Sequence, residues 1–136
     1  MRTKSLIAKP MLITLKHLFK KPVTVQYPEE KLTLAERYRG MHAYDLERCI
    51  ACSACVRICP NKCIELQVSI TPEGKKKIEA YNIYIGRCMF CGLCVEACPL
   101  KPKVITMTQK YELADYDRPS LVYGIERLRG GRESEP

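Results

Sequence analysis

The sequence predicts an α+β fold built from two similar halves, and two observations carry this prediction. First, a set of four cysteines occurs twice, and its second copy begins 39 residues after the first (88 − 49 = 39). Second, residues 64–70 alternate between apolar and polar side chains, as a half-buried strand does. A repeat of this period indicates two supersecondary units that pack against each other, often about a pseudo-twofold axis.

Each half is expected to contain a leading strand, a loop that carries the cysteines, a short helix and a trailing strand. The predicted leading strands are residues 43–46 and 78–85, and the predicted trailing strands are residues 64–70 and 104–108. Residues 71–77 contain a proline and a glycine and are expected to form a turn. The lysines of this turn are interpreted as a solvated tip.

An amphipathic helix is predicted over residues 10–20, with a proline in its first turn and Pro22 after its end. Apolar side chains share one face and lysines the other: Met11, Leu12, Leu15, Leu18 and Phe19 against Lys9, Lys16 and Lys20. Residues 1–21 carry six Lys or Arg residues and no acidic residue, which is typical of a helix that lies in a membrane surface. The alternative is a helix that packs on a partner protein, because a free helix of this length is marginally stable in water.

Three regions follow from these patterns. Residues 1–40 hold the amphipathic helix and an extended arm, residues 41–110 form the repeated domain, and residues 111–136 form a C-terminal arm. Residues 111–128 are polar and aromatic and are expected to cross the surface of the domain or of a partner. Residues 129–136 are rich in Gly, Glu and Ser and are expected to be disordered.

Cysteine usage and charge narrow the class of protein. The N-terminus is basic but shows no secretory cleavage site, so the nine cysteines indicate metal ligands in a reducing compartment. No apolar run approaches the length of a membrane span. The net charge of +8 suits an anionic membrane surface or acidic partner subunits. No nucleic-acid-binding motif is present, so we expect no nucleic-acid partner.

Two cysteine runs carry the chemistry. Both follow the pattern C-x₂-C-x₂-C-x₃-C-P, over residues 49–60 and 88–99. In two-cluster ferredoxins, three cysteines of such a run hold one [4Fe–4S] cluster and the fourth binds the other cluster. The predicted ligand sets are therefore crossed between the halves: Cys49, Cys52, Cys55 and Cys98 for one cluster, and Cys88, Cys91, Cys94 and Cys59 for the other.

The repeated domain is thus expected to be a bacterial two-[4Fe–4S] ferredoxin-like domain that moves electrons. Two oxidised clusters would change the net charge from +8 to about +4 (+8 − 4). Zinc is the main alternative, but zinc sites favour C-x₂-C pairs separated by longer gaps. No nucleotide fingerprint or nucleophile–base pair is visible, so we expect no catalytic residue and no direct small-molecule substrate.

Neighbouring residues are expected to tune the clusters. Cys63, the ninth cysteine, is interpreted as a small buried side chain, with a spare ligand or a redox thiol as alternatives. Ser53 in the first run takes the place of Gly92 in the second, and its hydroxyl is hypothesised to shift one cluster's potential. Seven apolar side chains are candidates to exclude water: Ile50, Ile58, Ile64, Met89, Phe90, Val104 and Ile105.

The chain resembles subunit I of NADH-quinone oxidoreductase (respiratory complex I), the TYKY-type subunit, over residues 9–128. Besides both cysteine runs, the resemblance is carried by residues 18–31 (LFKKPVTVQYPEEK), 37–40 (RYRG) and 111–118 (YELADYDR). The chain departs from that family at Cys63, where alanine is usual, and at Tyr84, where aspartate is common. Its stretch after Cys98 is also longer than usual.

The resemblance implies a non-catalytic electron-relay subunit of a proton-translocating membrane oxidoreductase. Electrons would pass through two [4Fe–4S] clusters toward the quinone-proximal cluster of a neighbouring subunit. The implied partners are that subunit, an upstream iron–sulfur subunit and a membrane-arm subunit. The implied location is peripheral, on the cytoplasmic face of the cell membrane or the equivalent side of an energy-coupling membrane.

Two alternatives stay open at this point. Related complexes use ferredoxin, F420H2 or hydrogen instead of NADH, and the sequence does not choose the primary donor. The other alternative is a freely diffusing two-cluster ferredoxin, although such carriers are usually acidic and compact, whereas this chain is basic and has long extensions.

Overall fold

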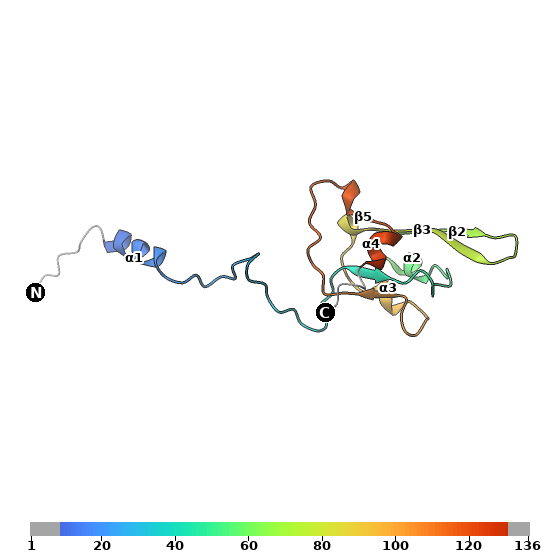
Figure 1. Cartoon of the computed structure of the whole chain (residues 1–136), viewed down its shortest axis with the longest axis horizontal. Coiled ribbons are helices and arrows are strands. Elements are labelled where there is room, and N and C mark those ends of the chain that lie inside the picture. The colour runs from blue at the N-terminus through green and yellow to red at the C-terminus, as the bar shows by residue number, and fades with distance from the viewer. Residues whose placement is uncertain (1–8, 131–136) are drawn as a thin grey trace, which may run out of the picture. The chain divides into compact units, whose positions relative to one another are not determined.

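The computed structural model describes residues 9–130, and its contacts divide the chain after Thr33 into two units. The first unit holds helix α1 (Lys9–Leu18) and the non-helical residues that follow it. The second unit starts at Leu34 and holds the remaining helices and strands (Figure 1).

Helix α1 lies close to its predicted span but begins at Lys9 and ends two residues early, at Leu18. Its apolar side chains are exposed within this unit, and Leu18 and Phe19 expose 74% and 83% of their surfaces. The basic side chains of its last turn, Lys16 and His17, lie where the helix dipole favours positive charge. Within residues 9–130, no helix has the length and apolarity that crossing a membrane requires.

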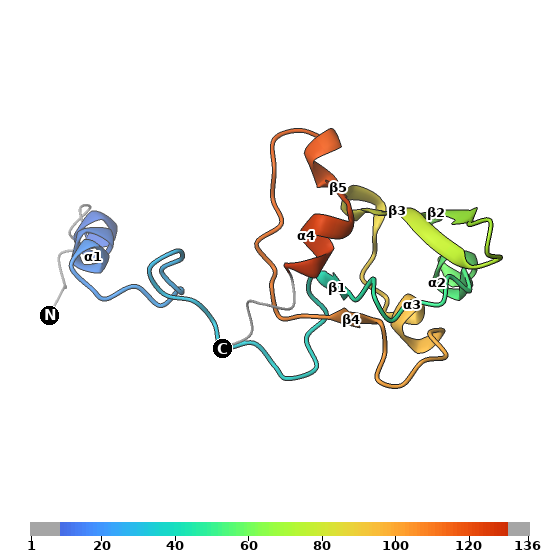
Figure 2. The ribbon, with the colours of Figure 1, turned by 45° about the vertical axis from the view of Figure 1, so that its right-hand side comes forward.

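The strands of the two halves pair crosswise. Strand β1 (His42–Tyr44) of the first half pairs antiparallel with β4 (Ile105–Met107) of the second half. Strand β2 (Ile64–Ile70) of the first half pairs antiparallel with β3 (Lys76–Tyr84), which leads the second half. Each pair therefore joins one strand from each half, as the pseudo-twofold repeat predicts (Figure 2).

The observed strands match the predicted ones with small differences. Strand β2 has its predicted bounds, whereas β1 and β4 are shorter than predicted. Strand β3 begins at Lys76, inside the predicted turn, because the turn is already closed by the bond from the Thr71 amide to the Lys75 carbonyl.

Two short helices follow the cysteine loops, at the same place in each half. They are α2 (Ala54–Ile58) and α3 (Leu93–Glu96), and they contact each other. The 3₁₀ turn η1 (Ile85–Arg87) connects β3 to the second cysteine loop. The loops are thus held between the crossed strands and this central helix pair.

The C-terminal residues form structure that the sequence did not predict. After the 3₁₀ turn η2 (Pro119–Leu121), strand β5 (Val122–Tyr123) pairs with β3, and helix α4 (Ile125–Arg129) contacts β1 and β3. Leu128 on α4 is completely buried. Arg129, expected to begin a disordered tail, is the last residue of α4, and residues 131–136 lie outside the described part of the chain.

The core of the second unit is built around aromatic and branched side chains. Tyr44 and Tyr81 stack in parallel, with ring centroids 4.0 Å apart, and are 2% and 1% exposed. Ile83 on β3 is fully buried beside them in the same cluster. Two of the predicted metal ligands, Cys94 and Cys98, belong to this core, and four others, Cys49, Cys55, Cys59 and Cys88, are partly buried against it.

Candidate metal centre

Each cysteine loop is shaped by two residues in the left-handed backbone region. Ala51 and Ser53 have φ angles of 52° and 58°, and their counterparts 39 positions later (51 + 39 = 90; 53 + 39 = 92), Phe90 and Gly92, have φ angles of 51° and 81°. Glycine alone adopts this conformation without steric strain, so the other three residues are held there by the surrounding structure. The chain thus builds the same tight loop twice.

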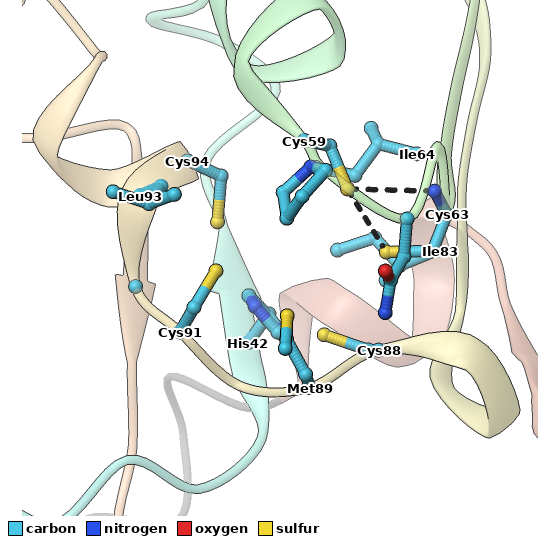
Figure 3. A pocket seen from close by; sticks show the side chains of 13 residues that line it. His42, Cys59, Cys63, Ile64, Ile83, Cys88, Met89, Cys91, Leu93 and Cys94 are labelled. Atoms are coloured by element: carbon cyan, nitrogen blue, oxygen red, sulfur yellow. Dashed lines mark hydrogen bonds between the residues drawn. The ribbon is translucent and has the colours of Figure 1, made fainter.

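Two cavities lie at these loops, and each brings together one predicted set of four cysteines. The first cavity is lined by Cys88, Cys91 and Cys94 and by Cys59 of the other half. Figure 3 shows these four sulfur atoms turned toward one space. The second cavity is lined by Cys49, Cys52 and Cys55 and by Cys98 of the other half. Each predicted set of four cysteines therefore lines one cavity.

The spacing of these cysteines suits a cluster better than a single ion. A zinc ion requires four sulfur atoms about 2.3 Å from one point. Within residues 9–130, no group of three or more Cys, His, Asp or Glu side chains is compact enough to hold one metal ion. A [4Fe–4S] core places an iron atom at each thiolate and so separates the four sulfur ligands. The donor set and its spacing therefore fit the predicted cofactor.

Two buried polar atoms give an independent test of that fit. Among the described residues, the buried side-chain atoms without a hydrogen-bond partner are His42 Nδ1 and the Tyr44 hydroxyl. His42 lines the first cavity and Tyr44 lines the second. Leaving a buried polar atom unpaired is unfavourable, so each cavity is expected to receive a group that offers a hydrogen-bond partner. Cluster sulfurs accept hydrogen bonds of this kind.

Burial controls the protonation of the loop thiols. It raises the pKa of the Cys55, Cys88 and Cys94 thiols, and that of Cys94 to about 12. These thiols are therefore protonated at neutral pH until a metal binds. Because the ligand form is the thiolate, metal binding must release these protons.

The two crossing cysteines behave differently from the loop cysteines. Burial also opposes ionisation of Cys59 and Cys98, but hydrogen bonds outweigh it and the pKa of both thiols is lowered. The backbone N–H of Cys63 donates to Cys59 Sγ over 3.4 Å. At Cys98 the lowering comes from the backbone N–H groups of Val104, Leu100 and Ile105, and then from the charge of Lys103. The backbone thus favours the thiolate at both crossing positions.

Cys63 lies in the wall of the first cavity. It is 2% exposed, and burial raises the pKa of its thiol. Its sulfur is 3.3 Å from Cys59 Sγ (Figure 3). The burial agrees with the interpretation of Cys63 as a packing residue, and the short distance adds a direct contact with a predicted ligand.

Sequence reasoning missed three buried rings at the cavities: His42 at the first, and Tyr44 and Tyr81 at the second. The available signal was the repeat itself, because His42 and Tyr81 lie 39 residues apart (81 − 42 = 39). Most of the predicted water-excluding side chains do line the cavities, namely Ile50, Ile64, Met89, Val104 and Ile105. Ser53 and Gly92 line corresponding places, so the effect of the Ser53 hydroxyl stays a prediction.

The class of protein follows from these cavities and from a family match. Residues 48–101 match the 4Fe-4S dicluster domain family. These residues therefore form a ferredoxin-like domain of the kind that holds two [4Fe–4S] clusters.

Curated relatives then identify the particular protein that the chain is related to, NAD(P)H-quinone oxidoreductase subunit I. The chain is 50% identical over 113 residues to this subunit of Prochlorococcus marinus (strain MIT 9303), which covers 83% of the chain and 51% of that relative. The subunit of Synechococcus sp. (strain CC9902) is 50% identical over 119 residues, covering 86% of the chain and 55% of the relative. The predicted resemblance is confirmed, and the chain spans about half the length of these curated relatives.

One solved structure resembles the chain as well. It is the membrane-bound sulfane sulfur reductase (MBS), described as an archaeal respiratory membrane complex. The matched chain is 36% identical with a TM-score of 0.55, and the match covers 87% of this chain and 60% of that one. Relatives of this chain are therefore named for two different enzymes, an NAD(P)H-quinone oxidoreductase and a sulfane sulfur reductase.

Proposed function

We propose that this chain is a non-catalytic electron-relay subunit of a complex I-type membrane oxidoreductase that couples NADH:quinone oxidoreduction to proton translocation. The observation that carries the proposal is the pair of four-cysteine cavities joined by two short helices, in a chain related to subunit I. When bound, each [4Fe–4S] cluster takes up and releases one electron. The primary donor and the quinone are proposed to bind other subunits.

The proposed ligands are Cys49, Cys52, Cys55 and Cys98 for the second cavity, and Cys88, Cys91, Cys94 and Cys59 for the first. Each short helix links the cavities, because Cys55 on α2 lines one and Cys59, just after α2, lines the other. Four residues of helix rise about 6 Å at 1.5 Å per residue, so the backbones of Cys55 and Cys59 lie close together and the two cavities are neighbours. Neighbouring cavities support electron transfer from one to the other.

The chain's other residues would hold and shield the clusters. Branched side chains on the cavity walls exclude water, which keeps the local dielectric low. Backbone N–H groups stabilise the thiolates, for example that of Phe90, which donates to Cys88 Sγ over 3.4 Å. These contacts fix the ligands before any electron arrives.

The proposed partners are the subunit with the quinone-proximal cluster, an upstream iron–sulfur subunit and a membrane-arm subunit. The exposed apolar side chains of α1 and its lysines support a peripheral position at the membrane surface. The cytoplasmic face of the cell membrane is the proposed side. Nucleic acid and small-molecule substrates have no place in this proposal.

The test is to reconstitute the full chain, reduce it with dithionite and record low-temperature EPR spectra alongside iron and sulfide content. About eight iron atoms and two interacting [4Fe–4S] signals are expected. Cys98→Ala should reduce the iron content by about half, because the second cavity loses its crossing ligand. Two zinc ions and no EPR signal would contradict the proposal, as would recovery of the chain from its source cells only as a free soluble monomer.

A second candidate is the same relay in a complex with another electron donor. The similarity to a chain of the sulfane sulfur reductase favours this candidate, because that complex is named for a different reaction. Purifying the intact complex and supplying NADH, reduced ferredoxin, reduced F420 or hydrogen separates the two. Reduction of this chain's clusters by NADH alone would exclude the second candidate.

A further inference from the structure

His42 has no role in the function proposed so far, although it faces a cluster cavity. It lies on strand β1, is 2% exposed and lines the first cavity. Figure 3 shows its imidazole among the cysteine side chains of that cavity. Its Nδ1 atom has no hydrogen-bond partner among the residues that the structure describes. Since an unpaired buried nitrogen is unfavourable, its partner is expected inside the cavity.

The internal repeat identifies the group that corresponds to His42 in the other half. It is Tyr81 on β3 (42 + 39 = 81), which is 1% exposed and lines the second cavity. The Tyr81 hydroxyl donates a hydrogen bond to Cys55 Sγ over 3.7 Å. The residue that corresponds to Cys55 is Cys94 (55 + 39 = 94), which lines the first cavity together with His42. Each leading strand therefore points a buried polar ring at the loop of the opposite half.

The chemistry of the ring suits a hydrogen-bond donor. A histidine ring carries at least one N–H in either protonation state, so the buried imidazole of His42 can donate a hydrogen bond. The ring of Phe90 stacks on it, with centroids 5.7 Å apart and an angle of 27° between the planes. The stack fixes the direction of the imidazole. Apart from His42 itself and Asn61, the side chains that line this cavity are cysteines and apolar residues. Most of the possible hydrogen-bond acceptors in the cavity are therefore sulfur atoms.

We propose that His42 Nδ1–H donates a hydrogen bond to a sulfur of the cluster in the first cavity, either a cluster sulfide or the Cys94 thiolate. This hydrogen bond raises the reduction potential of that cluster. The reduced cluster carries one more negative charge than the oxidised cluster, so the bond is stronger to the reduced form. Hydrogen bonds to sulfur are one of the ways a protein sets such potentials. In the second cavity the Tyr81 hydroxyl is the corresponding donor, and its hydrogen bond to Cys55 Sγ raises the reduction potential of that cluster. The inference rests on the proposed ligand sets.

The experiment measures the midpoint potentials of both clusters in the full reconstituted chain by EPR-monitored redox titration. His42→Phe keeps a ring against Phe90 but removes the donor. At a fixed ambient potential it should lower the reduced-to-oxidised ratio of one cluster about tenfold, which corresponds to about 59 mV for one electron. Tyr81→Phe should instead lower the midpoint potential of the other cluster. His42→Gln retains an N–H donor, so its midpoint potentials should stay close to those of the wild type.

Iron and sulfide content separate this inference from the proposed function. Wild-type protein without [4Fe–4S] signals would contradict the proposed function itself. His42→Phe protein with full iron content and unchanged potentials, or with equal shifts of both clusters, would overturn the role of His42.

A second measurement applies if His42→Phe fails to take up iron. The chain has two histidines, so a His17→Ala variant labelled with ¹⁵N-histidine carries the label at His42 alone. Electron spin-echo spectra of the reduced variant should show coupling of one ¹⁵N nucleus to a cluster. A spectrum without that coupling would overturn the inference.

Discussion

At the scale of single residues, Cys59 and Cys63 break the symmetry between the two cavities. Their sulfur atoms are 3.3 Å apart, so the first cavity has a fifth thiol beside its crossing ligand. The cysteines that line the second cavity are the four of its proposed ligand set. The loss of a crossing cysteine should therefore have different consequences on the two sides.

Cys63→Ala should retain both clusters, with about eight iron atoms per chain, because its sulfur is a packing group and not a ligand. Cys59→Ala should retain part of the iron of the cluster in the first cavity, since the Cys63 sulfur lies close enough to replace the lost ligand. The double variant Cys59→Ala/Cys63→Ala should retain about four iron atoms. Iron and sulfide analysis with EPR checks all three, and a loss of iron in Cys63→Ala alone would show that Cys63 is a ligand.

At Gly40 the backbone leaves no space for a side chain. A Cβ atom there would lie within 2.6 Å of the Thr108 carbonyl oxygen and even closer to that of Lys110. The Gly40 amide itself donates to the Thr108 carbonyl over 2.9 Å, so the segments around Gly40 and Thr108 cannot move apart without losing this hydrogen bond. Gly40→Ala should destabilise the holo-protein by about 2 kcal/mol.

The measurement for Gly40→Ala is the anaerobic thermal midpoint, followed by the visible absorbance of the clusters. Gly130→Ala is the matched control, because the nearest atom to a Cβ there is 3.8 Å away and its φ is negative. The control should change stability by less than about 0.5 kcal/mol. Equal midpoints for the two variants would contradict the clash.

At the scale of elements, the repeat and the alternation at Ile64–Ile70 were enough to predict the four main strands and both cysteine loops. Strand β5 and helix α4 were not predictable in the same way. Residues 111–128 carry no clear period, and a two-residue strand exists only because the edge of β3 accepts it at Ile83 and Tyr84. Likewise, the sequence did not show that His42 and Tyr81 line the cavities, because this depends on how the strands of the two halves pair.

Helix α4 should contribute strongly to stability despite its five residues. Leu128 is fully buried and α4 contacts β1 and β3, so Leu128→Ala should cost about 3 kcal/mol through lost burial and a residual cavity. Glu126→Ala on the exposed side of the same helix is the control and should change little. Thermal unfolding of the two holo-proteins checks this, and a mild effect of Leu128→Ala would mean that α4 is dispensable.

Helix α1 should bind anionic lipid through its exposed apolar side chains and its lysines. In the full chain, Leu15→Glu should weaken co-sedimentation with phosphatidylglycerol-containing vesicles about tenfold or more, because a charge enters the apolar face. Thr14→Glu is the matched control, since it adds the same charge at the neighbouring position. Equal binding by the two variants, or no binding by wild type, would favour a helix that packs on a partner protein.

At the scale of the whole molecule, the clusters are expected to be part of the folding energy of the second unit. Most of their proposed ligands lie in the hydrophobic core or pack against it, and core residues such as Ile64 and Ile105 line the cavities. Removing the iron would leave eight thiols around two voids, and structural metal sites contribute directly to folding free energy.

Treatment of the reconstituted full chain with a strong iron chelator and an oxidant should therefore abolish most of its β-sheet circular dichroism. Re-addition of iron and sulfide under reducing conditions should restore it. Apo-protein with an unchanged spectrum and a cooperative thermal transition would show that the fold does not depend on the clusters.

The crossed ligand sets also impose an order on biosynthesis. Cys49, Cys52 and Cys55 leave the ribosome at least 43 residues before Cys98, the fourth side chain of their cavity (98 − 55 = 43). Strand β1 is synthesised early, and its partner β4 in the second half is synthesised only after Cys98. Neither centre can be completed on a nascent chain that ends before the second cysteine run. With the proposed ligand sets, iron–sulfur delivery to this protein can be completed only after translation has passed residue 98.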